Sequence, residues 1–106
     1  MAKYLVIASY TSEGMKGVIS KGGSAREDAV AKMVADIGGT MESFYFAFGD
    51  DDAYVIVDLP DNTQAAALGM AVGASGSASC KTIVLLTPAE VDQAAQTKIN
   101  YRPPGS

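Results

Sequence analysis

The chain has 106 residues, a net charge of −4, 48% hydrophobic residues and 19% charged residues. This length suits one domain with a modest core, and the composition is that of a folded chain rather than a disordered one. The negative charge argues against nucleic acid and against an anionic membrane surface as partners. No apolar run approaches the ~20 residues that are needed to span a bilayer.

The sequence contains no histidine and a single cysteine, Cys80. The missing histidine excludes Ser-His-Asp and Cys-His nucleophiles, and it excludes metal and haem sites that depend on histidine ligands. A lone cysteine cannot form an intrachain disulfide, which favours a reducing compartment such as the cytoplasm. We expect no cofactor, and we expect Cys80 to be a small core residue rather than a reactive thiol.

The N-terminal part of the chain predicts a strand followed by a glycine-rich loop. Residues 3–11 have the β-branched and aromatic content that is typical of a strand. The following stretch, residues 12–23, contains four glycines and predicts a loop with one short helical turn around Met15–Ile19.

A helix is predicted next. Ser24 and Glu27 have the spacing of a capping box, which would make Ser24 the N-cap residue. Gly38 and Gly39 should end this helix. The residues that recur at helical spacing and predict its apolar face are Ala29, Val30, Met33, Val34 and Ile37.

The middle of the chain predicts a hairpin and a second helix. Residues 40–48 and 53–59 read as strands, and the short "GDDD" between them favours an antiparallel hairpin. After this hairpin, Asp61 and Gln64 have the spacing of an N-cap and its third helical residue. The helix that follows is rich in alanine and should pack closely.

The C-terminal part predicts a fourth strand and a further helix. Residues 80–87 form the strand, and the helix begins with Thr87 as N-cap and Glu90 completing a capping box. We expect this helix to run to about Lys98.

The order of the elements reads β-α-β twice. This order predicts an α+β, ferredoxin-like βαββαβ fold with a four-stranded antiparallel sheet and an extra C-terminal helix. We expect one domain over residues 1–98 and a Pro-rich tail over residues 99–106.

Apolar side chains occur on both faces of each predicted strand. Two helices can cover only one face of such a sheet, so the other face needs the last helix or a second copy of the chain as a cover. We therefore predict a dimer that forms through the sheet, with tyrosine, serine and aspartate side chains lining the space between the subunits.

Several short motifs, in this order, resemble the GYD family. They are "YTSEG", Arg26, Gly38-Gly39, "FYFAFG", "GDDD" and "PDN", and the resemblance covers roughly residues 3–95. It implies a ferredoxin-like dimeric α/β barrel that forms a homodimer or a larger homo-oligomer. It implies no reaction, because the family is without an established activity. Relatives by fold include small monooxygenases and isomerases, whose functions do not transfer through the fold alone.

The chain departs from the family in the hairpin. Gly49 and Asp52 match the Gly-Tyr-Asp element for which the family is named, whereas Asp51 stands where the tyrosine would be. Asp50, Asp51 and Asp52 could hold a hard cation, but adjacent residues rarely converge on one ion, and a hairpin turn is the favoured interpretation. We therefore predict no metal site, and Asp52 is the best candidate of the three for a ligand contact.

The stretch "KGGSAR" is a second candidate. Lys21, Arg26 and the amides of a helix N-terminus would suit a phosphate or a carboxylate. A flexible loop followed by the capping box is the favoured alternative, and Arg26 could instead pair with Glu42 or Asp52.

Polar residues of the sheet form a third candidate. A carboxylate in an apolar cavity could act as a base, and Glu42 and Asp58 are the only carboxylates inside predicted strands. Exposure at an edge or hydrogen bonding at a dimer interface is the favoured interpretation. The complete set of predicted ligand-binding residues is Tyr10, Arg26, Glu42, Tyr45, Asp52, Tyr54 and Asp58.

These observations predict a small cytoplasmic protein of the GYD type. We expect it to assemble through its sheet and to bind a small molecule in a cavity between subunits. One alternative is a cofactor-independent isomerase or monooxygenase that acts on a small apolar or aromatic molecule. Another is a regulatory domain that responds to a small anion at "KGGSAR".

Overall fold

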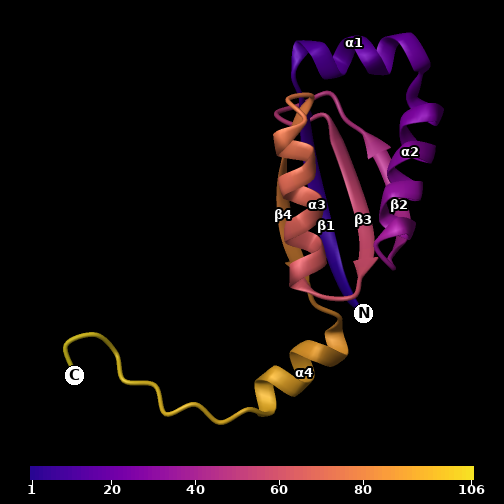
Figure 1. The fold of residues 1–106 in the computed structure, drawn as a ribbon. Coiled ribbons are helices and arrows are strands. Elements are labelled where there is room, and N and C mark those ends of the chain that lie inside the picture. The colour runs from indigo at the N-terminus through magenta and orange to yellow at the C-terminus, as the bar shows by residue number, and fades with distance from the viewer.

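Four antiparallel strands form one sheet: β1 (Ala2–Tyr10), β2 (Thr40–Phe46), β3 (Ala53–Leu59) and β4 (Ala78–Leu85). The computed structural model describes all residues from 1 to 106. The strands lie in the order β2-β3-β1-β4, so β1 and β3 occupy the centre (Figure 1). The chain therefore has an α+β fold, and its strand order is compatible with the predicted ferredoxin-like topology.

Four helices accompany the sheet: α1 (Ser12–Lys21), α2 (Gly23–Asp36), α3 (Asn62–Ala74) and α4 (Pro88–Gln96). Both α2 and α3 run alongside the strands, whereas α1 lies across one end of the sheet and α4 extends away from it with the C-terminal tail (Figure 1). The extra C-terminal helix is thus present as predicted. No helix has the length and apolar character that crossing a membrane would require.

The core lies between the sheet and the helices α2 and α3. Alternate residues of the central strands are buried there, because successive side chains of a strand point to opposite faces. Tyr4 is fully buried, and its hydroxyl donates a hydrogen bond of 2.6 Å to Asn62 Oδ1 at the start of α3. The other buried members of this cluster are Val6, Val34, Val55, Val57, Leu59, Ala65 and Leu68.

Three of the predicted helix ends are confirmed. The Asp61 side chain accepts a hydrogen bond from the backbone N–H of Gln64 and caps α3. Thr87 and Glu90 form both bonds of a capping box at the start of α4. After α2, Gly38 adopts a φ of 85°, a conformation that glycine reaches without strain.

The prediction of a loop over residues 12–23 is wrong, because residues 12–21 form the ten-residue helix α1, of which the predicted helical turn at Met15–Ile19 is only the middle part. Thr11 explains the difference. Its side chain accepts from the N–H of Gly14 and caps the helix, while its backbone N–H donates to the carbonyl oxygen of Ser77 at 3.0 Å. These contacts, one of them 66 residues away in sequence, outweigh the weak helix propensity of the glycines.

The prediction of Ser24 as an N-cap is also wrong. α1 leads into α2 through the single residue Gly22, which has a φ of 88° and serves as the N-cap of α2. No side chain caps this helix start. Ser24 already lies inside the first turn, so the capping box with Glu27 does not form.

Smaller differences occur at the ends of the other elements. β1 starts and ends one residue earlier than predicted, β2 ends at Phe46, β4 covers Ala78–Leu85 instead of 80–87, and α4 ends at Gln96 rather than near Lys98. A bulge between Met41 and Ser43 also changes which side chains of β2 share a face.

The close approach of α1 to the loop before β4 gives a first prediction. A Cβ atom on Gly14 would collide with the backbone carbonyl of Ser77, whereas a Cβ atom on Gly17 of the same helix would meet nothing within 4 Å. We expect Gly14→Ala to lower the free energy of unfolding by about 1–3 kcal/mol. Gly17→Ala should raise it by about 0.5–1 kcal/mol, since alanine is the better helix former.

Urea denaturation of both variants measures these changes. Equal stabilisation by the two substitutions would show that α1 does not dock on Ser77.

Candidate functional site

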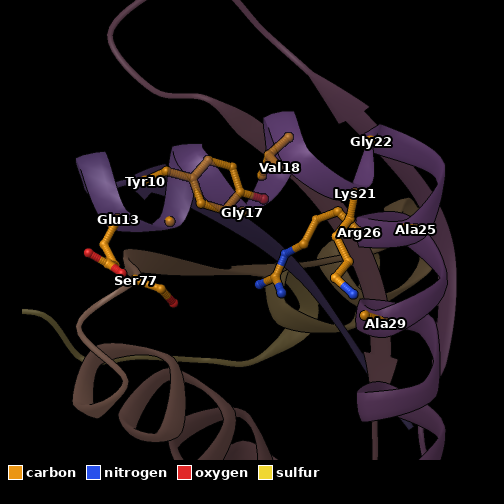
Figure 2. Close-up of a pocket in the computed structure, with 11 residues that line it drawn as sticks. Tyr10, Glu13, Gly17, Val18, Lys21, Gly22, Ala25, Arg26, Ala29 and Ser77 are labelled. Carbon is orange, nitrogen blue, oxygen red and sulfur yellow. The ribbon is translucent and has the colours of Figure 1, made fainter.

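A cavity of about 310 Å³ lies beneath α1, between that helix, the first turns of α2 and the end of β1. Tyr10 contributes the wall from β1 (Figure 2). Glu13 and Ser77 lie at one end of the cavity, and Lys21 and Arg26 lie at the other (Figure 2). Small residues, among them Gly17 and Ala29, line the rest and leave the space open.

Arg26 is the most distinctive residue of this cavity. Its guanidinium carbon lies 5.8 Å from the centroid of the Tyr10 ring, within the range of a cation–π contact. Its Nε atom is buried without a hydrogen-bond partner, and Arg26 forms no ion pair. An unpartnered buried donor costs about 1–3 kcal/mol, so an acceptor brought to this position would gain from it.

The alternative in which Arg26 pairs with Glu42 or Asp52 does not occur. Lys3 takes Glu42 as its partner, with 3.0 Å between Nζ and Oε1. Asp52 accepts a hydrogen bond of 2.8 Å from the backbone N–H of Tyr10. Both carboxylates are thus engaged elsewhere, and the Arg26 side chain faces the cavity with no acidic partner.

A second, apolar pocket lies deeper, between the sheet and the helices α2 and α3, and it shares Tyr10 and Arg26 with the outer cavity. It is small, about 40 Å³. Cys80 lines it and packs against the core, in agreement with the prediction of a core cysteine. Burial raises the pKa of the Cys80 thiol, while the positive charge of Arg26 acts in the opposite direction. The other walls of this inner pocket include Val30, Met33, Phe44 and Val72.

The "KGGSAR" stretch therefore lies at a cavity rather than in a flexible loop. Lys21 ends α1, Gly22 joins it to α2, and Arg26 is the fourth residue of α2. The favoured interpretation of this stretch depended on a capping box that does not form. Its place at the cavity gives the anion interpretation geometric support.

The three consecutive aspartates have separate structural roles. Asp50 is exposed. Asp52 holds the hairpin against β1, because its carboxylate accepts from the Tyr10 N–H and its own backbone N–H donates to Ala8. Asp51 is buried, with 8% of its surface exposed. No cluster of three or more possible metal ligands occurs in the chain.

Asp51 is the residue that sequence reasoning missed. Its carboxylate accepts hydrogen bonds from Ser9 Oγ at 2.6 Å and from Lys81 Nζ at 3.2 Å. The Ser9 bond first and the Lys81 bond second lower the pKa of this carboxyl. One signal was available in the sequence, because Asp51 occupies the position of the family tyrosine. In the structure this position faces the last residues of β1 and the first half of β4.

The remaining predicted residues lie on the opposite, uncovered face of the sheet. Tyr54 pairs with Tyr45 across β3 and β2, and Asp58 lies further along β3. Lys3 Nζ contacts both Glu42 and Asp58, at 3.0 and 3.1 Å. Of the seven predicted ligand residues, the structure brings Tyr10 and Arg26 together at the cavity and places the others on the uncovered face or in the hairpin.

The depressed pKa of Asp51 gives a prediction of pH dependence. A carboxylate with a lowered pKa stabilises the folded state above the unfolded pKa of about 3.9, and this stabilisation disappears as the pH falls through the lower folded value. Asp51→Asn should therefore lower stability at pH 7 and reduce the loss of stability between pH 5 and pH 2.

Thermal unfolding of both proteins across this range measures the effect, with Asp50→Asn as a control that should follow the wild type. Parallel curves for wild type and Asp51→Asn would contradict the role of the buried carboxylate.

Comparison with known proteins gives one match. A family model, the GYD domain, matches residues 4–95 of the chain. No curated protein and no solved structure matches. The match covers most of the chain and confirms the resemblance that the short motifs predicted. The chain therefore belongs to the GYD domain family.

Proposed function

We propose that this GYD domain is a small-molecule-binding protein that takes its ligand into the cavity beneath α1. The observation that carries the proposal is the buried, unpartnered Nε atom of Arg26 at a cavity of about 310 Å³. Ligand pockets typically begin near ~300 Å³, and they combine apolar walls with a few oriented polar groups. Tyr10, Lys21 and Arg26 would supply those groups.

The proposal includes self-assembly through the uncovered face of the sheet. Apolar and aromatic side chains extend across this face to both edge strands, where Ile83 of β4 is 44% exposed and Tyr45 of β2 is 71% exposed. Lys3 with Asp58 lies at one end of the face, and Lys81 with Asp51 lies towards the other. The half-buried residues Leu5, Ile7, Ile56 and Leu85 complete the apolar band.

A second copy of the chain is the cover that suits this face. Each Å² of apolar surface removed from water contributes about 25 cal/mol, and a two-fold interface would bring the same apolar band of both copies together. Glu42, Tyr45, Tyr54 and Asp58 would then line the contact between subunits as hydrogen-bonding groups. The dimeric barrel and a ligand contact for these four residues remain predictions.

Catalysis has no comparable support. No arrangement of residues in the cavity or on the sheet favours the isomerase or the monooxygenase alternative, so neither is proposed. A cytoplasmic location also stays a prediction, and it rests on the single free Cys80.

Filling the cavity tests the binding proposal. Ala29 lines the cavity, whereas Ala35 of the same helix is exposed and lies outside it. We expect ligand-detected NMR with a mixed library of charged and neutral fragments to identify binders of the wild-type protein. Ala29→Phe should lose these binders because the phenyl ring occupies their volume, and Ala35→Phe should keep them. The proposal fails if the wild type binds no fragment or if Ala29→Phe binds the same ones.

The assembly is tested by placing a charge on the uncovered face. We expect sedimentation of the wild type at micromolar concentration to show a dimer or a larger assembly. Ile83→Lys should give a folded monomer, since a lysine there would be desolvated without a partner. Ile19→Lys is the matched control, because Ile19 is 77% exposed on α1, away from this face. A wild-type monomer, or dissociation by both variants, would count against the interface.

A further inference from the structure

We propose that the ligand is a small organic carboxylate with a short apolar group, held with its carboxylate on Arg26 and its apolar group in the inner pocket. This inference rests on the proposed function, because it names the class of molecule that the cavity beneath α1 receives. The geometry points to it through the position of one side chain, Arg26, which lines both the outer cavity beneath α1 and the inner apolar pocket.

The positive charges of Arg26 and Lys21 favour an anionic ligand at this end of the cavity. Arg26 has no ion pair, and Lys21, which also lines the cavity, has none. Glu13 is the only acidic residue of the lining, and it lies at the far end from Lys21 and Arg26 (Figure 2). An anionic group would therefore be attracted to one end of the cavity, although the chain as a whole carries a net charge of −4.

The shape of the donors selects a carboxylate in preference to a bare inorganic anion. A planar guanidinium offers parallel N–H donors that match two carboxylate oxygens. The guanidinium carbon lies over the Tyr10 ring, 5.8 Å from its centroid, and both residues line the outer cavity and the inner pocket. The first turn of α2 begins beside this position at Gly22 and has no side-chain cap, which adds unoccupied backbone donors to the same end of the cavity.

The inner pocket selects the rest of the molecule. Tyr10 and Arg26 belong to both spaces, so a carboxylate bound to Arg26 would direct its substituent either outwards under α1 or inwards to the core. The inner walls are almost entirely apolar, and the void of about 40 Å³ suits a short alkyl group rather than a ring. Cys80 is part of those walls.

The single thiol of Cys80 provides a direct readout of this arrangement. Iodoacetate and iodoacetamide alkylate thiolates by the same displacement of iodide, and they differ in that the first carries a carboxylate. The readout is the rate of iodoacetate on Cys80 divided by the rate of iodoacetamide. Dividing this ratio by the ratio for the same protein unfolded in urea removes the intrinsic difference between the reagents. It also removes any change in the pKa of the thiol, which affects both reagents equally.

We expect this normalised ratio to be raised roughly fivefold in the native protein, as one short-range charge contact at the surface would produce. Arg26→Met should return it to about one, and Arg26→Lys should retain part of it. Lys32→Met is the matched control, because it removes one positive charge from the same helix, where Lys32 pairs with Asp36 outside both cavities. This control should leave the ratio unchanged.

A competition experiment tests the apolar group. Butyrate should slow the reaction of Cys80 with neutral iodoacetamide, and its uncharged analogue butyramide should not. Circular dichroism of each variant confirms that it is folded.

The inference is overturned by a ratio that Arg26→Met leaves unchanged, by an equal fall in Lys32→Met, or by equal protection from butyrate and butyramide. A native thiol that neither reagent reaches would also overturn it, because the inner pocket would then be closed behind Arg26. If fragments still bind the wild type and are lost in Ala29→Phe, the cavity stands as a binding site and only the ligand class is wrong.

Discussion

Two helices against a four-stranded sheet leave one face without a cover, and this constraint governs the structure. Alternate residues of β1 and β3 form the core with α2 and α3, so the residues between them must face outwards. Those residues include Leu5, Ile7 and Ile56, and a contiguous apolar patch of this kind is unusual on the water-exposed surface of a monomer. The ion-paired groups around Lys3 and Lys81 frame this apolar band. The uncovered face thus has the composition of an interface, while the helix side carries the cavity.

The cavity exists because α1 is held away from the sheet at a fixed place. Thr11 anchors the start of α1 to the loop before β4, and at the other end of α1 Gly22 turns the chain into α2, which runs alongside the strands (Figure 1). Between these two points α1 spans the end of the sheet, and the small residues on its inner side leave space above Tyr10 and Arg26. Arg26 has no acidic partner in this arrangement, because the Asp52 carboxylate bonds to the Tyr10 N–H and Glu13 lies at the other end of the cavity.

Local signals in the sequence were sufficient for most of the fold. The caps at Asp61 and Thr87, the glycines after α2 and the hairpin at "GDDD" act over a few residues, and all of them were predicted correctly. The strand faces of β1 and β3 also followed from simple alternation. The helix α1 could not be predicted in this way, because a contact with Ser77 stabilises a segment that is rich in glycine.

The site was harder to predict than the fold. Tyr10 and Arg26 were both among the predicted ligand residues, but their contact depends on the turn at Gly22, which the sequence did not reveal. Asp51 was interpreted as a turn residue, with Asp52 as the better ligand candidate, and only the tertiary structure separates the buried carboxylate of Asp51 from the exposed one of Asp50. The bulge in β2 likewise brings Met41 and Phe44 to the core side, against strict alternation.

The C-terminal arm, formed by α4 and the tail, changes the shape of the particle. The Cα radius of gyration is 16.9 Å, whereas a compact chain of this length would have about 13 Å. No residue of α4 is buried, and the family match ends at residue 95, within α4. Mutations in this arm would therefore cost the folded body little stability, and the tail after α4 lies outside the family match. In scattering or diffusion measurements the chain should behave as a larger object than its mass of 10.9 kDa suggests.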